Sequence, residues 1–329
     1  MRAWRVHSLG EPKDVLQLDD VDVPEPGPGE ARIRVEAAAL NFFDALLCRG
    51  TYQEKPPLPF TPGAEVAGVV EAVGDGSPYG VGQRVLASPP LPHGGLAEQV
   101  VAPAHSTFAI PDSLSPVKAA ALFITYQTGW AGLHRRAALQ AGETLLVHAG
   151  AGGVGSAAIQ LGLAAGARVI ATAGGPEKTE ICRSLGAEIA VDYLADDFVD
   201  VVKSATGGRG ADVIYDSVGG DTFDKSRKCI ASEGRLVVVG FAGGRIAEAP
   251  TNHLLVKNYS VVGLHWGLYR HTEPSLIPHI HDELLALHAS GAIDPLIFAE
   301  LPLADAADAI TSLSSRGTWG KVVLTPGAR

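Results

Sequence analysis

A glycine-rich run between a strand-like and a helix-like segment constrains this chain more than any other feature. The run is LLVHAGAGGVGSAAIQLG, residues 145–162, in which Gly150, Gly152 and Gly155 fit the pattern GxGxxG. The first glycine of this pattern permits a tight turn, the second lets backbone approach a pyrophosphate, and the third lets helix and strand pack closely. The N-terminus of the following helix offers free N–H groups to phosphate. The run therefore predicts a dinucleotide-binding loop, and an ordinary glycine-rich turn is the alternative.

The segments after this loop support the first interpretation. Short β-branched runs alternate with helix-like runs, and the strand-like ones are TLLVHA from Thr144, RVIATA from Arg168, EIAVDY from Glu188, DVIYDS from Asp212, RLVVVG from Arg235 and SVVGLHW from Ser260. Strands separated by helices are typical of a parallel sheet. We therefore expect an α/β fold with a Rossmann-type, doubly wound, six-stranded parallel sheet.

The two ends of the chain have a different texture. Residues 1 to about 115 contain many Pro and Gly turns between alternating runs such as ARIRVEAAAL and EVAGVVEAV, which is typical of a mainly β domain. The tail after residue 270 contains two helix-like stretches, an extended stretch and the final strand GKVVLT. This tail is too short for a domain, so we expect it to fold back onto the first. The expected domains are 1–118 with 268–329, and 119–267.

Charge and cysteine content exclude several classes of protein. The formal net charge of -10 and the absence of a basic stripe argue against nucleic acid or an anionic membrane as a partner. The three cysteines, Cys48, Cys182 and Cys229, lie far apart and form no CxxC pair, so neither a disulfide framework nor a zinc ribbon is predicted. No apolar run approaches the length that spans a bilayer, and no signal peptide is apparent. We expect a cytoplasmic protein.

The end of the second predicted strand bears on the choice of cofactor. A chain that prefers NAD usually places Asp or Glu there to bind the ribose hydroxyls. In this chain the strand ends ATAGGPEK, where Gly174 and Gly175 leave room for a 2′-phosphate and Lys178 is positioned to pair with it. The pattern favours NADPH over NADH, although Lys178 is also compatible with a solvated lysine at a helix start.

Motifs along almost the whole chain resemble one family. They are LNFFDALLCRGTY (40–52), PFTPGAEVAGVVEAVG (59–74), GGLAEQVV (94–101), TYQTGWAGL (125–133), the glycine loop, YDSVGG (215–220) and the terminal GKVVL. Together they resemble the zinc-independent quinone oxidoreductases of the medium-chain dehydrogenase/reductase superfamily. The resemblance implies a GroES-like catalytic domain made from both ends of the chain, an inserted Rossmann domain and a substrate cleft between them.

Residues of the wider superfamily that this chain does not have are also informative. The positions that hold zinc ligands in the zinc-dependent members of the superfamily correspond here to Asn41, Ala64 and Ile124. None of these is an ordinary zinc ligand, because zinc prefers thiolate, imidazole or carboxylate. We expect no metal site among the five histidines between 265 and 288. We therefore expect no metal and no zinc.

The resemblance also implies the site residues. Asn41, Tyr52 and Thr128 would border the nicotinamide or the acceptor and supply hydrogen-bond donors there. The alternatives are a turn role for Asn41, packing for Tyr52 and helix capping for Thr128. The implied cofactor-binding residues are Asn41, Thr128, Gly150, Gly152, Gly153, Val154, Gly174, Lys178, Tyr193, Val218, Phe241 and Leu264. The last three are equally compatible with core packing.

Four further residues were compatible with more than one role. Asp44 and Glu65 match family positions but can also brace a turn. Lys321 can close over the cofactor or lie exposed. His265, at the end of the sixth strand, can donate a proton to the acceptor or only line the pocket.

A site without a metal limits the acceptor. Charge that develops on a carbonyl oxygen must then be stabilised by hydrogen-bond donors. A quinone or an α,β-unsaturated carbonyl spreads this charge over a conjugated system and needs less polarisation than a simple ketone. The leading hypothesis is an NADPH-dependent quinone oxidoreductase. The alternatives are an enone, alkenal or acrylyl-thioester reductase, and a non-catalytic NADPH-binding protein. A homodimer through the edge strand near 259–266 is also expected.

Overall fold

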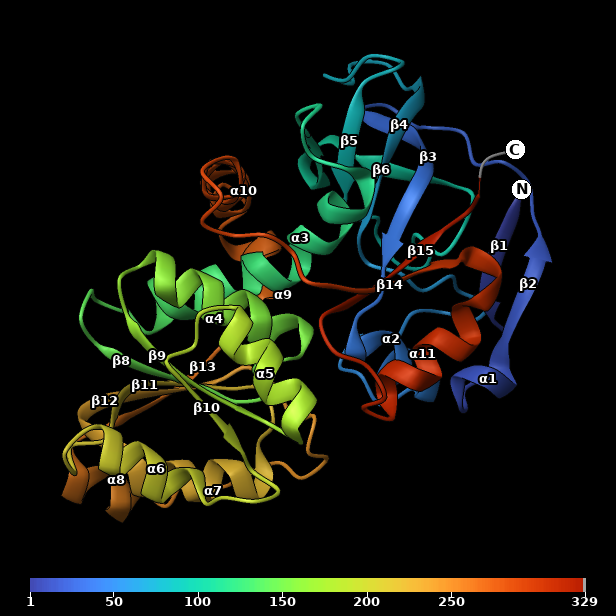
Figure 1. The fold of residues 1–329 in the computed structure, drawn as a ribbon. Coiled ribbons are helices and arrows are strands. Elements are labelled where there is room, and N and C mark those ends of the chain that lie inside the picture. Colours follow the sequence, from blue (N-terminus) through green and yellow to red (C-terminus); the bar gives the residue numbers. More distant parts are fainter. Residues whose placement is uncertain (328–329) are drawn as a thin grey trace. The chain divides into compact units, whose positions relative to one another are not determined.

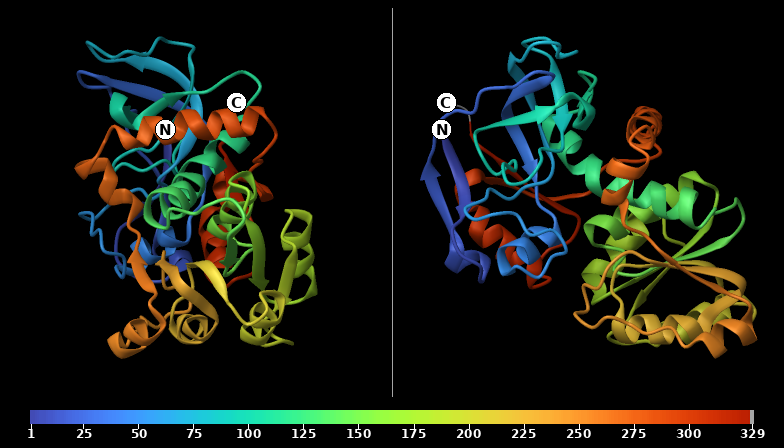
Figure 2. Two further views of the ribbon diagram at one scale, coloured as in Figure 1. Left: turned by 90° about the vertical axis from the view of Figure 1, so that its left-hand side faces the viewer. Right: turned by 180° about the vertical axis from the view of Figure 1, so that it is seen from behind.

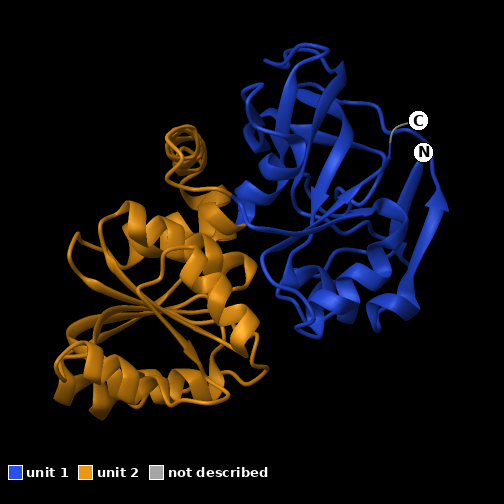
Figure 3. Cartoon of the chain, viewed as in Figure 1, with its two compact units in different colours: residues 1–124, 295–329 blue, residues 125–294 orange. Residues whose placement is uncertain are grey.

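The computed structural model describes residues 1–327. These residues form two compact units, one made of residues 1–124 together with 295 onward, and one made of residues 125–294 (Figure 3). The chain therefore leaves the first unit, completes the second and returns. No helix among the described residues combines the length and the apolar character that a membrane crossing requires.

The unit of residues 125–294 contains the expected parallel sheet. Its strands are β8 (Thr144–Val147), β9 (Arg168–Ala173), β10 (Ile189–Asp192), β11 (Ala211–Asp216), β12 (Ile230–Val238) and β13 (Ser260–Gly263). Their spatial order is β10-β9-β8-β11-β12-β13, and every neighbouring pair is parallel. The order reverses beside β8, the strand that leads into the glycine loop. Sheets of this topology bind ligands at the carboxyl ends of the strands next to that reversal.

Helices cover both faces of this sheet (Figure 1). One face carries α4 (Gly153–Ala164) and α5 (Pro176–Ser184), and the other carries α6 (Phe198–Ala205), α7 (Gly220–Cys229) and α8 (Thr251–Lys257). The unit also contains α9 (Trp266–Thr272) and α10 (Leu276–Ala289). Because both faces are covered, β8 is buried throughout, and β9 and β11 are buried except for one half-buried residue in each.

The other unit is built mainly from antiparallel strands. They are β3 (Glu30–Ala39), β4 (Val66–Val73), β5 (Arg84–Ala87), β6 (Gln99–Pro103), β7 (Thr107–Ala109), β14 (Ile297–Pro302) and β15 (Lys321–Thr325), with the separate pair β1 (Arg2–Val6) and β2 (Leu16–Asp20). The larger sheet has the order β14-β15-β3-β4-β5-β7, and β6 pairs with β3. The helices are α1 (Pro12–Val15), α2 (Phe42–Arg49) and α11 (Ala306–Ser314), and α3 (Pro116–Trp130) continues into the second unit.

The C-terminal tail completes the mainly β unit, as expected. Strand β15 runs antiparallel to β3, and Val323 lies opposite Ala39, although the two are separated by most of the chain. Both views of Figure 2 show the red C-terminal segment beside the blue N-terminal segment. Trp4 Nε1 also donates a hydrogen bond to Leu303 O over 2.6 Å. These contacts bury the tail against the N-terminal segment.

The division between the units falls at other residues than the sequence analysis placed it. Residues 268–294, expected with the mainly β domain, group with residues 125–267, and the first boundary lies inside α3. Hydrogen bonds explain this grouping of α9 and α10. Gln127 Nε2 donates to Ile277 O of α10 over 3.0 Å, and Gln127 Oε1 accepts from Trp266 Nε1 of α9 over 3.3 Å. Such long-range side-chain bonds leave no periodic signal in a sequence.

Candidate functional site

The glycine loop has the geometry that a bound pyrophosphate needs. Gly155 lies so close to the end of β8 that a Cβ there would be 2.1 Å from Ala149 O, and a Cβ at Gly150 would be 2.9 Å from Ala171 Cβ and Cys182 Sγ. At Gly152, by contrast, the nearest atom to a Cβ would be Ala149 O at 3.2 Å. Gly150 and Gly155 therefore serve packing, and Gly152 keeps open the approach to the N-terminus of α4.

The residues that follow Gly152 continue this open surface. Gly152 is the residue before α4, and Gly152, Gly153 and Val154 are half-buried, whereas Gly155 is buried. The first N–H groups of a helix have no intrahelical acceptor, and they carry partial positive charge. The loop and helix start therefore fit a dinucleotide pyrophosphate.

A second part of the candidate site lies at the ends of β9 and β10. Strand β9 ends at Ala173, so no carboxylate occupies the position that binds ribose hydroxyls in NAD-preferring folds. The Tyr193 side chain is packed on Gly174, where a Cβ would be 2.6 Å from Tyr193 Oη. Lys178 is half-buried in the first turn of α5, which begins beside Gly174. The carboxyl ends of β9 and β10 thus bring together Gly174, Lys178 and Tyr193.

Asp192 holds this stretch in place. Its Oδ1 accepts hydrogen bonds from Gly175 N over 2.8 Å and from Leu194 N over 3.0 Å. The sequence analysis did not identify this role. Asp192 stands opposite Ala173 in the β10–β9 pairing, and pairing across strands is not visible in the local sequence.

The expected nicotinamide residues lie at the carboxyl ends of the other strands. Val218 follows β11 and is half-buried, Phe241 follows β12 and is 41% exposed, and Leu264 follows β13 and is buried. The exposure of Phe241 does not fit the core-packing alternative, whereas the burial of Leu264 does. Because the strands are parallel, all three residues lie on the side of the sheet where the strands end, which is also the side of the glycine loop.

Asp216 is a site residue that the sequence analysis missed. Its Oδ1 accepts hydrogen bonds from Val218 N over 2.8 Å and Gly219 N over 2.9 Å, which fixes the loop that carries Val218. Its Oδ2 is buried and has no protein partner among the described residues. A buried carboxylate oxygen without a donor is costly, so this atom marks a place where a bound group can supply one.

His148, which precedes the glycine loop, links the elements that hold this loop. It is fully buried, with Nδ1 3.0 Å from Thr172 Oγ1 and Nε2 2.8 Å from Ser226 Oγ. Ser226 Oγ donates to Thr222 O, so it accepts from Nε2–H, and Nδ1 accepts from Thr172. Burial lowers the pKa of His148, against the opposing effect of Asp216. The imidazole is therefore neutral and joins β8, β9 and α7 beneath the glycine loop.

The mainly β unit contains a buried charged cluster. Lys321 Nζ donates to Glu65 Oε1 over 2.7 Å, to Asn41 Oδ1 over 2.8 Å and to Leu40 O over 2.7 Å. Glu65 Oε1 also accepts from Asn41 Nδ2 over 2.9 Å, and Glu65 Oε2 accepts from Ile124 N over 2.6 Å. Lys321 is 3% exposed and Glu65 is 0% exposed. The expectation that Lys321 could lie exposed is therefore wrong.

This cluster gathers the positions that correspond to zinc ligands in the zinc-dependent enzymes. Asn41 and the Ile124 backbone both hydrogen-bond Glu65, and Ala64 precedes Glu65 in the chain. A positive charge is present there, but it is the ammonium group of Lys321. Among residues 1–327, no group of three or more His, Cys, Asp or Glu side chains is arranged to hold a metal ion.

Asn41 also begins helix α2. Its backbone N donates to Asp44 Oδ2 over 2.8 Å, and Asp44 Oδ1 accepts from Gly63 N over 3.1 Å. Burial raises the pKa of Asp44 to about 6, although these two bonds oppose the shift. Asp44 and Glu65 therefore brace the local backbone. The second hydrogen of the Asn41 amide has only a long contact, 3.5 Å, with Ala39 O.

Tyr52 and Thr128 differ from Asn41 in having unengaged hydroxyl groups. The Tyr52 ring is stacked on Phe43, with ring centroids 5.2 Å apart, and burial raises the pKa of Tyr52 to about 12. Thr128 lies inside α3, so the helix-capping alternative is wrong. Within the described part of the chain, neither hydroxyl has a hydrogen-bond partner in the protein.

Two family models match the chain. The model described as "Alcohol dehydrogenase GroES-like domain" matches residues 27–112, and the one described as "Zinc-binding dehydrogenase" matches residues 153–282. The chain is 41% identical to the quinone oxidoreductase-like protein 2 of Rattus norvegicus, over 98% of this chain and 93% of that protein.

Solved structures give the same result. An Escherichia coli quinone oxidoreductase complexed with NADPH has a TM-score of 0.91 and 31% identity, covering 99% of this chain and 100% of that one. The CurK enoyl reductase has a TM-score of 0.87 and 29% identity, covering 98% of each chain.

The six-stranded sheet with its glycine loop and the GroES-like unit together define a medium-chain dehydrogenase/reductase. Within that superfamily, the chain belongs to the quinone oxidoreductase-like family.

Proposed function

We propose that this protein is an NADPH-dependent quinone oxidoreductase that works without a metal ion. The observation that carries the proposal is the Lys321–Glu65–Asn41 cluster. It places an ammonium group among the positions that correspond to zinc ligands, and it occupies both Glu65 oxygens. An acceptor whose reduction needs no Lewis acid fits such a site best, and a conjugated quinone is such an acceptor.

The proposed cofactor is NADPH. Gly152, Gly153 and Val154 at the start of α4 would hold its pyrophosphate, and Lys178 with Tyr193 would hold its 2′-phosphate. Val218, Phe241 and Leu264 would contact the nicotinamide. The similar E. coli quinone oxidoreductase was solved in complex with NADPH, which supports this choice. When bound, the cofactor supplies reducing equivalents from its nicotinamide ring.

The chain's own residues would then stabilise charge on the acceptor oxygen. The Tyr52 and Thr128 hydroxyls are available as donors, and so is the weakly engaged hydrogen of the Asn41 amide. Burial raises the pKa of Tyr52 to about 12, so this hydroxyl keeps its proton at neutral pH and acts as a donor. Lys321 would position Asn41 by holding its Oδ1.

An enone reductase is the second candidate, and the likeness to the CurK enoyl reductase favours it. The two candidates share the cofactor and the donors, and they differ in the acceptor. A conjugated carbonyl of either kind spreads the incoming charge, so both acceptors suit the same hydrogen-bond donors. The acceptor must be tested directly.

The test compares initial rates of cofactor oxidation by the purified protein. The four pairs are NADPH or NADH with 1,4-benzoquinone or with a short 2-alkenal. We expect the highest kcat/KM for NADPH with the quinone, and we expect Lys178→Ala to lower the NADPH value while leaving the NADH value unchanged. Faster reduction of the alkenal would assign the protein to the enone reductases. Tight NADPH binding without turnover on either acceptor would indicate a non-catalytic binding protein.

We also propose that the protein is a homodimer. Strand β13 pairs with β12 on one side and lies at the edge of its sheet, with Val261 and Val262 half-buried. Two such edges can pair around a two-fold axis, which removes the unpaired strand from solvent. Sedimentation equilibrium should give twice the chain mass at micromolar concentration. A monomer at all concentrations would contradict this proposal.

A further inference from the structure

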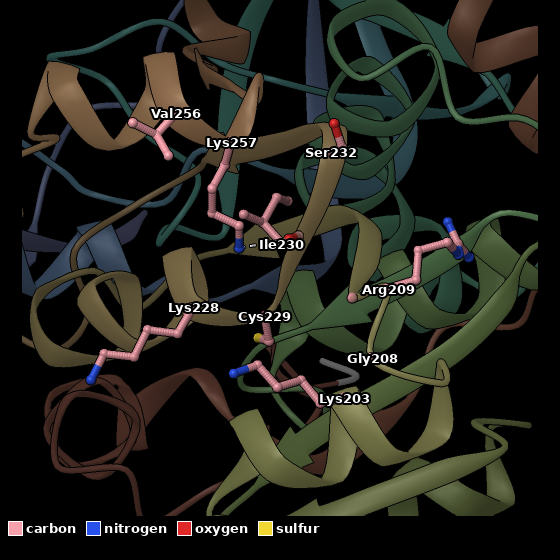
Figure 4. A pocket seen from close by; sticks show the side chains of 10 residues that line it. Lys203, Gly208, Arg209, Lys228, Cys229, Ile230, Ser232, Val256 and Lys257 are labelled. Carbon is pink, nitrogen blue, oxygen red and sulfur yellow. Dashed lines mark hydrogen bonds between the residues drawn. The ribbon is translucent and has the colours of Figure 1, made fainter.

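A pocket of ≈ 370 Å³ lies in the unit of residues 125–294, away from the candidate cofactor site. It is lined by the loop before β11, the start of β12 and the C-terminal turns of α6, α7 and α8 (Figure 4). The glycine loop and Asp216 lie at the carboxyl ends of the strands, whereas Gly210 and Ile230 lie at the amino ends of β11 and β12. Because these strands are parallel, the pocket lies at their amino ends and the cofactor site at their carboxyl ends.

Four cationic side chains line this pocket, although the chain as a whole has a net charge of -10. They are Lys203, Arg209, Lys228 and Lys257. Arg209 is paired with Asp212 and is therefore neutralised locally. Lys203 and Lys228 are exposed, and the charge of Lys228 lowers the pKa of the neighbouring Asp197, whose carboxylate is already paired with Lys225. The pocket therefore carries a local excess of positive charge.

The ends of three helices account for part of this charge pattern. Lys203, Lys228 and Lys257 lie in the last turns of α6, α7 and α8, where a cation interacts favourably with the helix dipole. Lys257 has a further role, because its Nζ donates to Ile230 O over 3.0 Å and to Arg227 O over 3.2 Å. The helix ends explain why one lysine is present at each helix, but they do not explain why three lysines line one pocket.

The charges in the pocket act on one another. Burial lowers the pKa of Lys257, Cys229 opposes this shift, and the charge of Lys203 adds to it. Figure 4 shows Lys203 and Lys257 extending from opposite walls toward the part of the pocket formed by Cys229 and Ile230. Burial raises the pKa of the Cys229 thiol to about 12, so the thiol is neutral and offers no negative charge to the lysines. A bound anion would relieve this repulsion.

We propose that this pocket binds the phosphate group of a small phosphorylated molecule. Lys203 and Lys228 would supply mobile ammonium groups, and Lys257, fixed by its two carbonyl acceptors, would supply a third positive charge. The volume suits a small metabolite, and the Ile230 side chain gives it one apolar wall. Lysines bind phosphate as point charges and impose little geometry, which fits recognition of the phosphate more than of the rest of the molecule.

Inorganic pyrophosphate is a suitable probe for this site. The full-length protein, with a small excess of NADPH to occupy the cofactor site, is titrated with pyrophosphate in a calorimeter. We expect one binding event per chain that weakens as salt is added. The double variant Lys203→Gln, Lys228→Gln should weaken binding about 25-fold, at about fivefold for each exposed ion pair lost. Both side chains are exposed, so we expect the variant to fold normally.

The control is Lys225→Gln, which removes a charge from α7, the helix that also carries Lys228. Lys225 Nζ lies 3.0 Å from Asp197 Oδ2 and does not line the pocket, so pyrophosphate binding should not change. A second readout is acetylation of lysines followed by mass spectrometry, in which pyrophosphate should protect Lys203 and Lys228 but not Lys225. Absence of binding, equal weakening in the control, or binding that NADPH abolishes would overturn the proposal.

Discussion

Lys321 Nζ lies 2.7 Å from Glu65 Oε1, and both side chains are almost completely buried, at 3% and 0% exposure. The ammonium group also donates to Asn41 Oδ1 and Leu40 O, so each of its three N–H groups has an acceptor in the protein. A buried ion pair of this kind contributes less through its own attraction than through the cost of leaving either partner alone. The pair therefore fixes the arrangement of β15, β3 and the start of α2.

Removing one partner of this pair should be more damaging than removing both. Lys321→Met leaves Glu65 charged and buried, and we expect a loss of about 3–5 kcal/mol in the free energy of unfolding. The double variant Lys321→Met, Glu65→Gln should recover much of that loss because no unpaired charge remains. Urea denaturation of the single and double variants measures the difference. Equal stability of Lys321→Met and the unsubstituted protein would contradict the assigned role.

Asp44 should make stability depend on pH. Its pKa is raised from 3.8 to about 6 by burial, so the folded protein binds this proton more tightly than the unfolded chain does. The corresponding stabilisation is complete below the unfolded pKa and is lost as pH rises through 6. Relative to Asp44→Asn, the unsubstituted protein should lose about 2 kcal/mol between pH 4.5 and 7.5.

The Asp44 comparison uses thermal or urea unfolding at several pH values. All other titrating groups are shared by the two proteins and cancel in the difference. Asp112→Asn is the control, because the Asp112 side chain is fully exposed. A stability difference between Asp44→Asn and the unsubstituted protein that does not vary with pH would show that Asp44 is ionised throughout.

Two glycines of the phosphate loop should respond differently to alanine. At Gly155 the new Cβ would stand 2.1 Å from Ala149 O, so Gly155→Ala must displace α4 and lower the thermal midpoint by several degrees. At Gly152 the nearest atom is 3.2 Å away, so Gly152→Ala should fold normally and lose NADPH affinity, about tenfold, because the methyl group lies where the pyrophosphate would approach. Fluorescence titration with NADPH and thermal unfolding separate the two effects.

The Tyr52 hydroxyl can be tested without disturbing its packing. Tyr52→Phe keeps the stacked contact with Phe43 and removes only the hydroxyl. If this group donates to the acceptor, kcat should fall about 10- to 100-fold while the unfolding midpoint stays unchanged. Phe43→Leu is the matched variant, which disturbs the stacking and leaves the hydroxyl in place. Unchanged kcat in Tyr52→Phe would assign Tyr52 to packing alone.

Local sequence patterns were sufficient for the dinucleotide-binding fold. All six expected strands are present, because β-branched runs separated by helix signals encode each strand and helix separately. The glycine pattern at 150–155 also predicted the open start of α4. Neighbouring atoms leave no room for a side chain at Gly150 and Gly155, and the surface at Gly152 stays open. The missing carboxylate after β9 could be read directly from Ala173 and Gly174.

Features that depend on distant contacts could not be predicted in the same way. Lys321 and Glu65 are separated by most of the chain, and a lysine at the start of a strand is ordinarily exposed. The grouping of α9 and α10 with residues 125–267 depends on single hydrogen bonds that Gln127 makes with Trp266 and Ile277. The basic pocket arises because the ends of three helices meet. A cytoplasmic location stays a prediction.

The most direct measurement is the rate of quinone reduction by NADPH in protein whose metal content is known. The protein is dialysed against a chelator, its zinc is measured by mass spectrometry, and the rate with 1,4-benzoquinone is compared with that of the untreated protein. Because Lys321 supplies the positive charge beside Glu65 and Asn41, we predict a full rate with far less than one zinc per chain. Loss of activity on chelation, with recovery when zinc is returned at one per chain, would contradict the metal-free site.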